Sequence, residues 1–259
     1  MTIKGLKINY KTLGEGRPLL ILHGWGSSSE KWQKIGELLA QKGVKVIIPD
    51  LPGFGKSEEP QKAWNLDQYC DFVEEFIKIL NLDKFYPVRD SRGNKKAQNK
   101  DISNGVYLLG HSFGGSLAVK FSLQHPEKVA KLFLVSAACI RKKSLKNKLF
   151  KFISRFFKIK PLFLRKFFYR KSDYLSVKSV MKETYLKVIE EDLSDVLEKV
   201  KVPTMIIWGA KDKITPIKQA KLIKTKIRNS ELKIIPNIGH SPHLEAPEKL
   251  GDRVSQELL

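Results

Sequence analysis

The five residues Gly-His-Ser-Phe-Gly at 110–114 constrain the fold of this chain more than any other segment. They follow an apolar run typical of a buried strand and precede a helical pattern that continues to about Gln124 and stops near Pro126. A strand that turns sharply into a helix through G-x-S-x-G raises the serine hydroxyl above the sheet edge. The segment therefore predicts an α/β sheet with Ser112 as a nucleophile, although a glycine-rich turn with an idle serine has the same pattern.

Apolar runs and helical patterns alternate along most of the chain, which is typical of a mostly parallel central sheet flanked by helices. We expect strands at 6–11, 19–22, 44–48, 106–109, 132–135, 204–208 and 232–235, and helices at 29–41, 66–80 and 247–258. Two segments break the alternation. The polar stretch at 86–104 predicts an exposed insert, and the basic, helix-like stretch at 139–199 lies between two expected core strands.

Two later loops carry the groups that a serine nucleophile needs. A serine requires an adjacent base, and in this architecture the chain order is serine, acid, histidine. Asp212 follows the sixth expected strand and His240 follows the seventh, and loops at the carboxyl ends of such strands meet at one edge of the sheet. We predict that His240 removes the Ser112 proton and that Asp212 orients His240. Each residue alone is also compatible with an ordinary turn or surface position, and His243 is the alternative base.

The loop after the second expected strand reads His-Gly-Trp-Gly. Stabilising an oxyanion requires backbone N–H groups aimed at the developing charge, and we expect Trp25 and Phe113 to supply them. The alternative is that the glycines only permit a tight turn while Trp25 packs in the core, and both interpretations can hold together. We also assign His23, Gly24 and His111 to the substrate-binding surface, with the two histidines fixing loops by hydrogen bonds rather than acting as bases.

Taken together, these motifs resemble the α/β-hydrolase superfamily over about 200 of the 259 residues. They are His-Gly-Trp-Gly at 23–26, Pro-Asp-Leu-Pro-Gly-Phe-Gly-Lys-Ser at 49–57, Gly-His-Ser-Phe-Gly-Gly at 110–115, Trp-Gly-Ala-Lys-Asp at 208–212 and Gly-His-Ser-Pro-His at 239–243. The resemblance implies a core of residues 1–138 and 200–259 with a helical cap at 139–199 covering the site. It also implies hydrolysis without a cofactor, and it favours His240 over His243 as the base.

The pair His-Gly-Trp-Gly and Asp-Leu-Pro-Gly-Phe-Gly is further similar to carboxylesterases that cleave the methyl ester of pimeloyl-acyl carrier protein. Those enzymes usually have Trp where this chain has His111, and the insert at 86–104 is a second departure. We therefore predict a serine hydrolase that cleaves a small-molecule carboxylic ester through an acyl-enzyme. A thioesterase, a carbon–carbon bond hydrolase, and a catalytically idle relative that binds a ligand or lipid stay open as alternatives.

Charge is the most unusual feature of the composition, with a formal net charge of +21. Residues 141–187 hold sixteen Lys and Arg against Asp173 and Glu183, so this segment alone carries +14. Its Phe and Leu residues at helical spacing, surrounded by cations, favour docking to an acidic carrier protein or to an anionic membrane. A solvated basic face is the plain alternative. Nucleic acid is not predicted, because charge alone would support it and no binding motif accompanies the charge.

The remaining composition bears on location and on metals. Cys70 and Cys139 do not make a disulfide framework, so we expect both to be reduced and buried. The first ten residues lack the apolar core of a signal peptide, and no apolar run is long enough to span a bilayer. These features predict a cytoplasmic location. No Cys/His cluster has metal-ligand spacing, so we predict no metal site.

Overall fold

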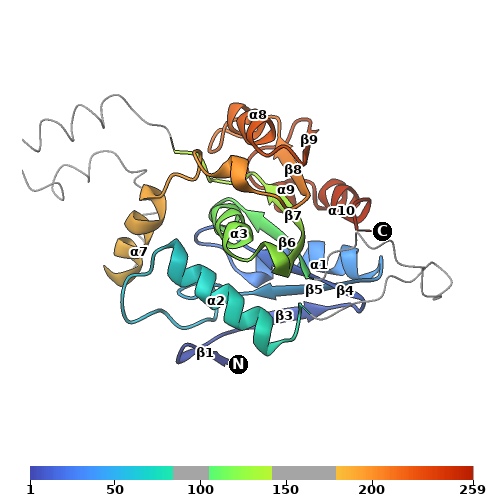
Figure 1. The fold of residues 1–259 in the computed structure, drawn as a ribbon. Coiled ribbons are helices and arrows are strands. Elements are labelled where there is room, and N and C mark those ends of the chain that lie inside the picture. The colour runs from blue at the N-terminus through green and yellow to red at the C-terminus, as the bar shows by residue number, and fades with distance from the viewer. Residues whose placement is uncertain (84–104, 142–178, 259) are drawn as a thin grey trace, which may run out of the picture.

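The computed structural model describes residues 1–83, 105–141 and 179–258 (Figure 1). The predicted insert at 86–104 and the larger part of the predicted cap, 142–178, lie outside these residues. Seven strands form one sheet in the order β3-β5-β4-β6-β7-β8-β9, and only β3 is antiparallel to its neighbour. This arrangement confirms the predicted mostly parallel α/β-hydrolase sheet. The strands are β1 (Thr2–Ile3), β2 (Leu6–Lys7), β3 (Tyr10–Leu13), β4 (Arg17–Leu22), β5 (Val44–Pro49), β6 (Val106–His111), β7 (Val129–Val135), β8 (Thr204–Gly209) and β9 (Ser230–Ile235).

Helices cover both faces of the sheet because successive strand residues point to opposite faces. In β4, Leu20 and Leu22 pack in the cluster that α2, α3 and α8 complete, whereas Leu19 and Ile21 pack in the cluster that α1 and α10 complete. All four side chains are fully buried. The helices are α1 (Gln33–Ala40), α2 (Leu66–Ile79), α3 (Phe113–Gln124), α7 (Ser179–Glu190), α8 (Ile217–Lys226), α9 (Pro242–Glu245) and α10 (Pro247–Ser255), and a 3-10 turn at Ser29–Trp32 leads into α1.

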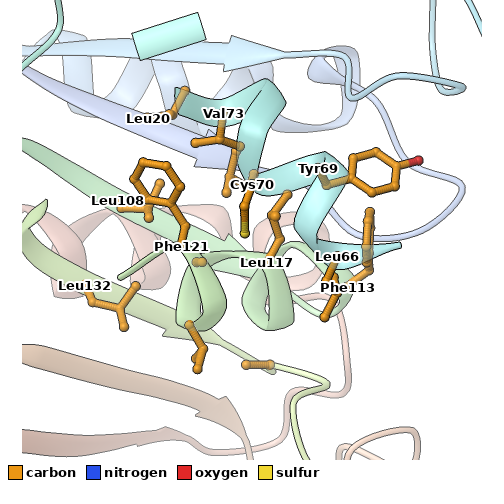
Figure 2. Packing of buried hydrophobic residues seen from close by; sticks show 14 of the residues in the cluster. Leu20, Leu66, Tyr69, Cys70, Val73, Leu108, Phe113, Leu117, Phe121 and Leu132 are labelled. Carbon is orange, nitrogen blue, oxygen red and sulfur yellow. The ribbon is translucent and has the colours of Figure 1, made fainter. Parts of the chain in front are cut away.

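The contact between α2 and α3 supports the helix that follows Ser112. Asn65 and Gln68 form a reciprocal capping box that fixes the start of α2. Figure 2 shows α2 side chains such as Cys70 facing α3 side chains such as Leu117 and Phe121 within one buried cluster. Packing of this kind, rather than helix propensity, holds α3 in a fixed position against β6.

The first expected strand, 6–11, is wrong in extent. It divides into β2, which pairs with β1 in a separate two-stranded sheet, and β3, which joins the edge of the main sheet. Lys4 and Gly5, with φ of 51° and 76°, form the turn between β1 and β2. The Ile8 N–H then donates to the Met1 carbonyl instead of to the main sheet. The alternating sequence pattern runs through both strands and does not mark this division.

Both cysteines are free and buried, as the sequence predicted. Burial raises the pKa of the Cys139 thiol to about 12 and also raises the pKa of Cys70. Both sulfurs are therefore thiols rather than thiolates at neutral pH. In the part of the chain that the structure describes, no helix combines the length and the apolar character needed to cross a bilayer.

Candidate active site

Ser112 lies at the turn between β6 and α3 with a strained backbone, φ 53° and ψ −114°. Its N–H donates to the Val135 carbonyl at 3.1 Å, and its carbonyl accepts from the Ala138 N–H at 2.9 Å. Gly114 permits the turn, because a Cβ at that position would lie 2.0 Å from the Leu22 carbonyl oxygen. The neighbouring strands β4 and β7 thus determine the turn, and the strain is stored where a hydroxyl must project from the sheet edge.

The structure brings Ser112, His240 and Asp212 into one hydrogen-bonded line. The Ser112 Oγ lies 3.0 Å from His240 Nε2, and His240 Nδ1 lies 2.9 Å from Asp212 Oδ2. His240 follows β9 and Asp212 follows β8, so the three groups come from loops at the carboxyl edge of the sheet. Because a carboxylate oxygen only accepts, His240 Nδ1 carries the proton and Nε2 is free to accept one from Ser112.

Asp212 is anchored by a residue that sequence reasoning missed, Thr215. The Thr215 hydroxyl donates to Asp212 Oδ2 at 2.8 Å, while the N–H groups of Ile214 and Thr215 donate to Oδ1 at 2.8 and 2.9 Å. Burial raises the pKa of Asp212, but the hydrogen bonds from His240 and Thr215 outweigh burial and leave the pKa below its ordinary value. Asp212 is therefore a fixed carboxylate at neutral pH. A threonine three residues after the acid, just before Pro216, was the available signal.

The loop that carries His240 is held by a second unpredicted residue, Glu245 of α9. Its carboxylate accepts from the Gly239 N–H at 2.7 Å and from the Ser241 N–H at 3.0 Å. The N–H groups of the residues before and after His240 are therefore bonded to one side chain. Sequence offered only the position of Glu245 five residues after His240, which does not reveal where its oxygens point.

The loop that begins at His23 lies directly beside Ser112. A Cβ on Gly24 would lie 3.3 Å from Ser112 Cβ and 3.0 Å from His111 Nδ1, so only glycine fits there without displacement. The backbone N–H groups of Trp25 and Phe113 have no acceptor among the described residues. The Trp25 and Phe113 rings meet edge to face with centroids 5.5 Å apart. The structure thus places the two predicted oxyanion donors on adjoining segments that flank Ser112.

His23 connects two loops under the site. Its Nδ1 lies 2.8 Å from the Gly24 carbonyl and its Nε2 accepts from the Leu51 N–H at 3.0 Å, which assigns the proton to Nδ1. Burial lowers the pKa of His23 to about 4, even though the Gly24 carbonyl and Asp50 favour the charged form. His23 is therefore a neutral, fully buried link between backbone groups, and both ring nitrogens that a substrate would contact are already occupied.

His111 and His243 form a buried pair beside His240. The His111 Nε2 lies 2.9 Å from the main-chain carbonyl of His240, and its ring centroid is 4.6 Å from that of His243. Burial, and then the two neighbouring histidines, lower the pKa of His111 far below its ordinary value, while burial lowers the pKa of His243 to about 3. His243 stacks on Trp32 at 4.2 Å, so His240, and not the alternative His243, occupies the position beside Ser112.

The described ends of the predicted cap meet each other and reach the site. The Leu193 N–H donates to the Cys139 carbonyl at 3.0 Å, and Arg141 donates to the Val188 carbonyl of α7. Tyr185 of α7 has its ring 5.0 Å from that of Trp25. Because 142–178 lie outside the described residues, docking of 141–187 to an acidic carrier protein or an anionic membrane stays a prediction. Across 1–83, 105–141 and 179–258, no three His, Cys, Asp or Glu side chains gather to hold a metal ion.

Known proteins share the sequence pattern and the fold of this chain. Residues 17–247 match the protein family described as serine aminopeptidase, S33. Lipase 1 of Psychrobacter immobilis is 28% identical over 262 residues, covering 92% of this chain and 75% of the lipase. A 2-hydroxy-6-oxo-6-(2'-aminophenyl)hexa-2,4-dienoic acid hydrolase of Metapseudomonas resinovorans is 25% identical, covering 94% of this chain and 84% of that enzyme. An esterase structure from Exiguobacterium antarcticum shares the fold with a TM-score of 0.74 at 24% identity, covering 99% of this chain and 97% of that one.

Proposed function

Because the chain belongs to the serine aminopeptidase S33 family of α/β hydrolases, we propose that it is a serine carboxylesterase with Ser112 as its nucleophile. One observation carries the proposal, the line from Ser112 Oγ through His240 to the Asp212 carboxylate, with distances of 3.0 and 2.9 Å. Such a line lets the histidine take a proton on one nitrogen while the carboxylate stabilises the charge that results on the ring. The similarity to a lipase supports an ester as the substrate.

Acylation begins when the Ser112 oxygen attacks the carbonyl carbon of the ester and its proton passes to His240 Nε2. The C–O bond of the ester then breaks, and the leaving alkoxide takes that proton, so the alcohol departs and Ser112 carries the acyl group. Asp212 stays ionised throughout, because its hydrogen bonds hold its pKa low. In the second half, a water gives a proton to His240 and attacks the acyl carbon. The bond from that carbon to Ser112 Oγ then breaks, the serine oxygen takes the proton back from His240, and the acid departs.

The negative oxygen of each tetrahedral intermediate needs donors, and the N–H groups of Trp25 and Phe113 are the proposed pair. Their support is that both lack a protein acceptor in the described residues and belong to segments that flank Ser112. Preorganised donors of this kind contribute about 3 to 4 kcal/mol each to transition-state stabilisation. Gly24 brings the loop to this position without a side chain between the Trp25 backbone and the ester.

The decisive experiment is replacement of Ser112 by alanine in the purified protein. We expect S112A to lose labelling by a fluorophosphonate probe and to lose turnover of p-nitrophenyl esters by at least about a thousandfold. The matched control is S230A, at the first residue of β9 and therefore at the sheet edge opposite to Ser112, and it should keep the labelling and turnover of wild type. Comparing acyl chains of increasing length measures the size of the acyl pocket. Turnover that survives in S112A contradicts the proposal.

A second activity, hydrolysis of a carbon–carbon bond in a diketone-type acid, is favoured by one finding. The dienoic acid hydrolase named above is related along 94% of this chain, and the same three side chains would serve that reaction. A direct comparison of kcat/KM on a vinylogous diketone and on a p-nitrophenyl ester separates the two. A thioester and an aminoacyl amide belong in the same assay. An ester preference supports the first proposal, and a diketone preference replaces it.

We also propose that residues 139–199 form a cap over Ser112. The support comes from α7, where Tyr185 contacts Trp25 and Thr184 Oγ1 accepts from the Trp64 N–H at 3.1 Å. Met181 approaches the loop after β5 so closely that a Cβ on Gly53 would lie 2.4 Å from its terminal atoms. If the cap shapes the acyl site, Tyr185→Leu should change the preferred acyl length while leaving the fluorophosphonate reaction of Ser112 intact.

A further inference from the structure

The backbone at and beside His240 is hydrogen-bonded on two sides by side chains that the mechanism does not use. On the buried side, His111 lies with Nε2 2.9 Å from the His240 carbonyl oxygen. Because a carbonyl only accepts, that nitrogen carries the proton and donates it. On the exposed side, the Glu245 carboxylate accepts from the N–H groups of Gly239 and Ser241. Three consecutive residues centred on His240 are thus each bonded through the main chain.

The position of His111 lowers the stability of the folded protein. With its proton on Nε2, His111 has a bare acceptor at Nδ1, and this atom has no hydrogen-bond partner among the described residues. Trp32 Nε1 and His243 Nδ1, on rings that contact each other and His111, are equally without partners in that part of the chain. All three side chains are at most 5% exposed. Each unpartnered buried polar atom is destabilising, so an apolar residue at 111 would suit the packing better than histidine.

A neutral donor is what the position requires. The His111 ring lies 5.1 Å from the His240 ring, so a cation there would oppose the positive charge that His240 gains during acyl transfer. Burial keeps His111 uncharged, as its lowered pKa shows. An imidazole can therefore donate to the carbonyl without repelling the imidazolium, which neither lysine nor arginine could do.

We propose, on the basis of the proposed function, that His111 and Glu245 are positioning residues that hold His240 between Ser112 and Asp212. His111 then serves catalysis at the expense of the stability of the folded protein. His111 contributes the larger share, because its hydrogen bond is part-buried, whereas water can replace the exposed Glu245 carboxylate. Loss of the hydrogen bonds of either residue widens the range of positions that His240 Nε2 takes relative to Ser112 Oγ. The chemical step then slows without a matching change in substrate affinity.

The test uses the full chain and a p-nitrophenyl ester, with active enzyme counted by fluorophosphonate titration. We expect H111L to lower kcat about tenfold to a hundredfold with KM within about twofold of wild type. Its Tm should stay close to that of wild type, because removal of the unpartnered Nδ1 offsets the loss of the hydrogen bond from Nε2 to the His240 carbonyl. H111Q, whose amide N–H can reach the same carbonyl, should recover kcat to within about threefold. E245A should lower kcat about threefold to tenfold. The matched controls are H125L, at a half-buried position, and E248A, at an exposed one. Neither residue bonds to the backbone beside His240, so both variants should keep the kcat and KM of wild type.

The outcomes separate this inference from the function on which it rests. If S112A is inactive and H111L keeps wild-type kcat, the positioning role is wrong and the esterase proposal stands. If H111Q is as slow as H111L, or H111L loses Tm in proportion to its active fraction, His111 is merely structural and the inference fails. If S112A is active, both proposals fall. Should H111L not fold, H111N takes its place, because its shorter side chain does not reach the His240 carbonyl, and the double variant of H111N with E245A still decides, because coupled positions give a non-additive loss of kcat.

Discussion

The two halves of the candidate site are held in place by different kinds of interaction. On the acid–base side, Thr215 donates to Asp212 and His111 donates to the His240 carbonyl, while Glu245 accepts from the backbone N–H groups beside His240. On the oxyanion side, the backbone of the loop is placed by close packing around Gly24, and its aromatic rings meet edge to face. On the acid–base side, activity should therefore fall when a polar atom is removed at constant side-chain shape. On the oxyanion side, activity should fall when side-chain volume changes at constant polarity.

The largest effect expected from this contrast is in Asp212→Asn. The amide keeps the shape but removes the carboxylate charge and disturbs the tautomer of His240, so kcat should fall by about a thousandfold to ten-thousandfold. Stopped-flow or steady-state ester hydrolysis measures it. D252N is the control, because Asp252 is an exposed residue of α10 that pairs with Lys42 and not with the candidate site. A loss below tenfold in D212N would show that the acid–base side does not depend on its polar atoms.

Low pH should lower the free energy of unfolding through protonation of His23, which lies under the oxyanion side. Its pKa is about 4 in the folded protein against the ordinary histidine value of 6.5 in an unfolded chain, so between these pH values the unfolded state binds more protons. His23 alone should thus lower the free energy of unfolding by on the order of 2 to 3 kcal/mol as pH drops from about 6.5 to about 4. Urea unfolding across this range measures it. In H23N the slope should be shallower, and an unchanged slope would contradict the assignment.

A smaller effect is expected from adding one methyl group at Gly24. The new Cβ would lie 3.0 Å from His111 Nδ1 and 3.3 Å from Ser112 Cβ, so the loop must move by a few tenths of an ångström. We expect G24A to lower kcat about tenfold through displacement of the Trp25 N–H. The control G251A puts its methyl 3.6 Å from Leu38, an ordinary contact, and should keep full activity. Equal activity in both variants would mean that packing does not determine the oxyanion side.

The smallest effect should come from Thr215→Val, which removes one hydroxyl at nearly constant shape. Asp212 keeps its backbone donors at Ile214 and position 215, so kcat should fall only about fivefold, with KM unchanged. The control T225V alters an exposed threonine on α8 and should leave kcat as it is. A loss as large as that of D212N would indicate that the hydroxyl, rather than the backbone, anchors the acid.

The sequence predicted those parts of the molecule that follow from local pattern and chain order. Ser112, Asp212 and His240 each follow an apolar strand, and a parallel sheet necessarily gathers such positions at one edge. Glu245 could not be found in this way, because its role depends on two backbone N–H groups turned toward it. The division of 6–11 into two strands was missed for a related reason. The turn at Lys4 and Gly5 pairs Leu6 and Lys7 with β1 instead of with the main sheet, while the alternation of side chains stays intact.

The hydrogen bond between Leu193 and Cys139 has a consequence for how such a protein can diversify. It closes the base of the whole segment between β7 and β8, so the chain departs from the sheet and rejoins it at nearly one point. Residues added or removed beyond that bond change the segment without shifting the strands that carry Ser112 and Asp212, since loop length costs little once the ends are joined. We therefore expect insertions and deletions between 139 and 193 to be tolerated with the relative positions of Ser112 and Asp212 unchanged.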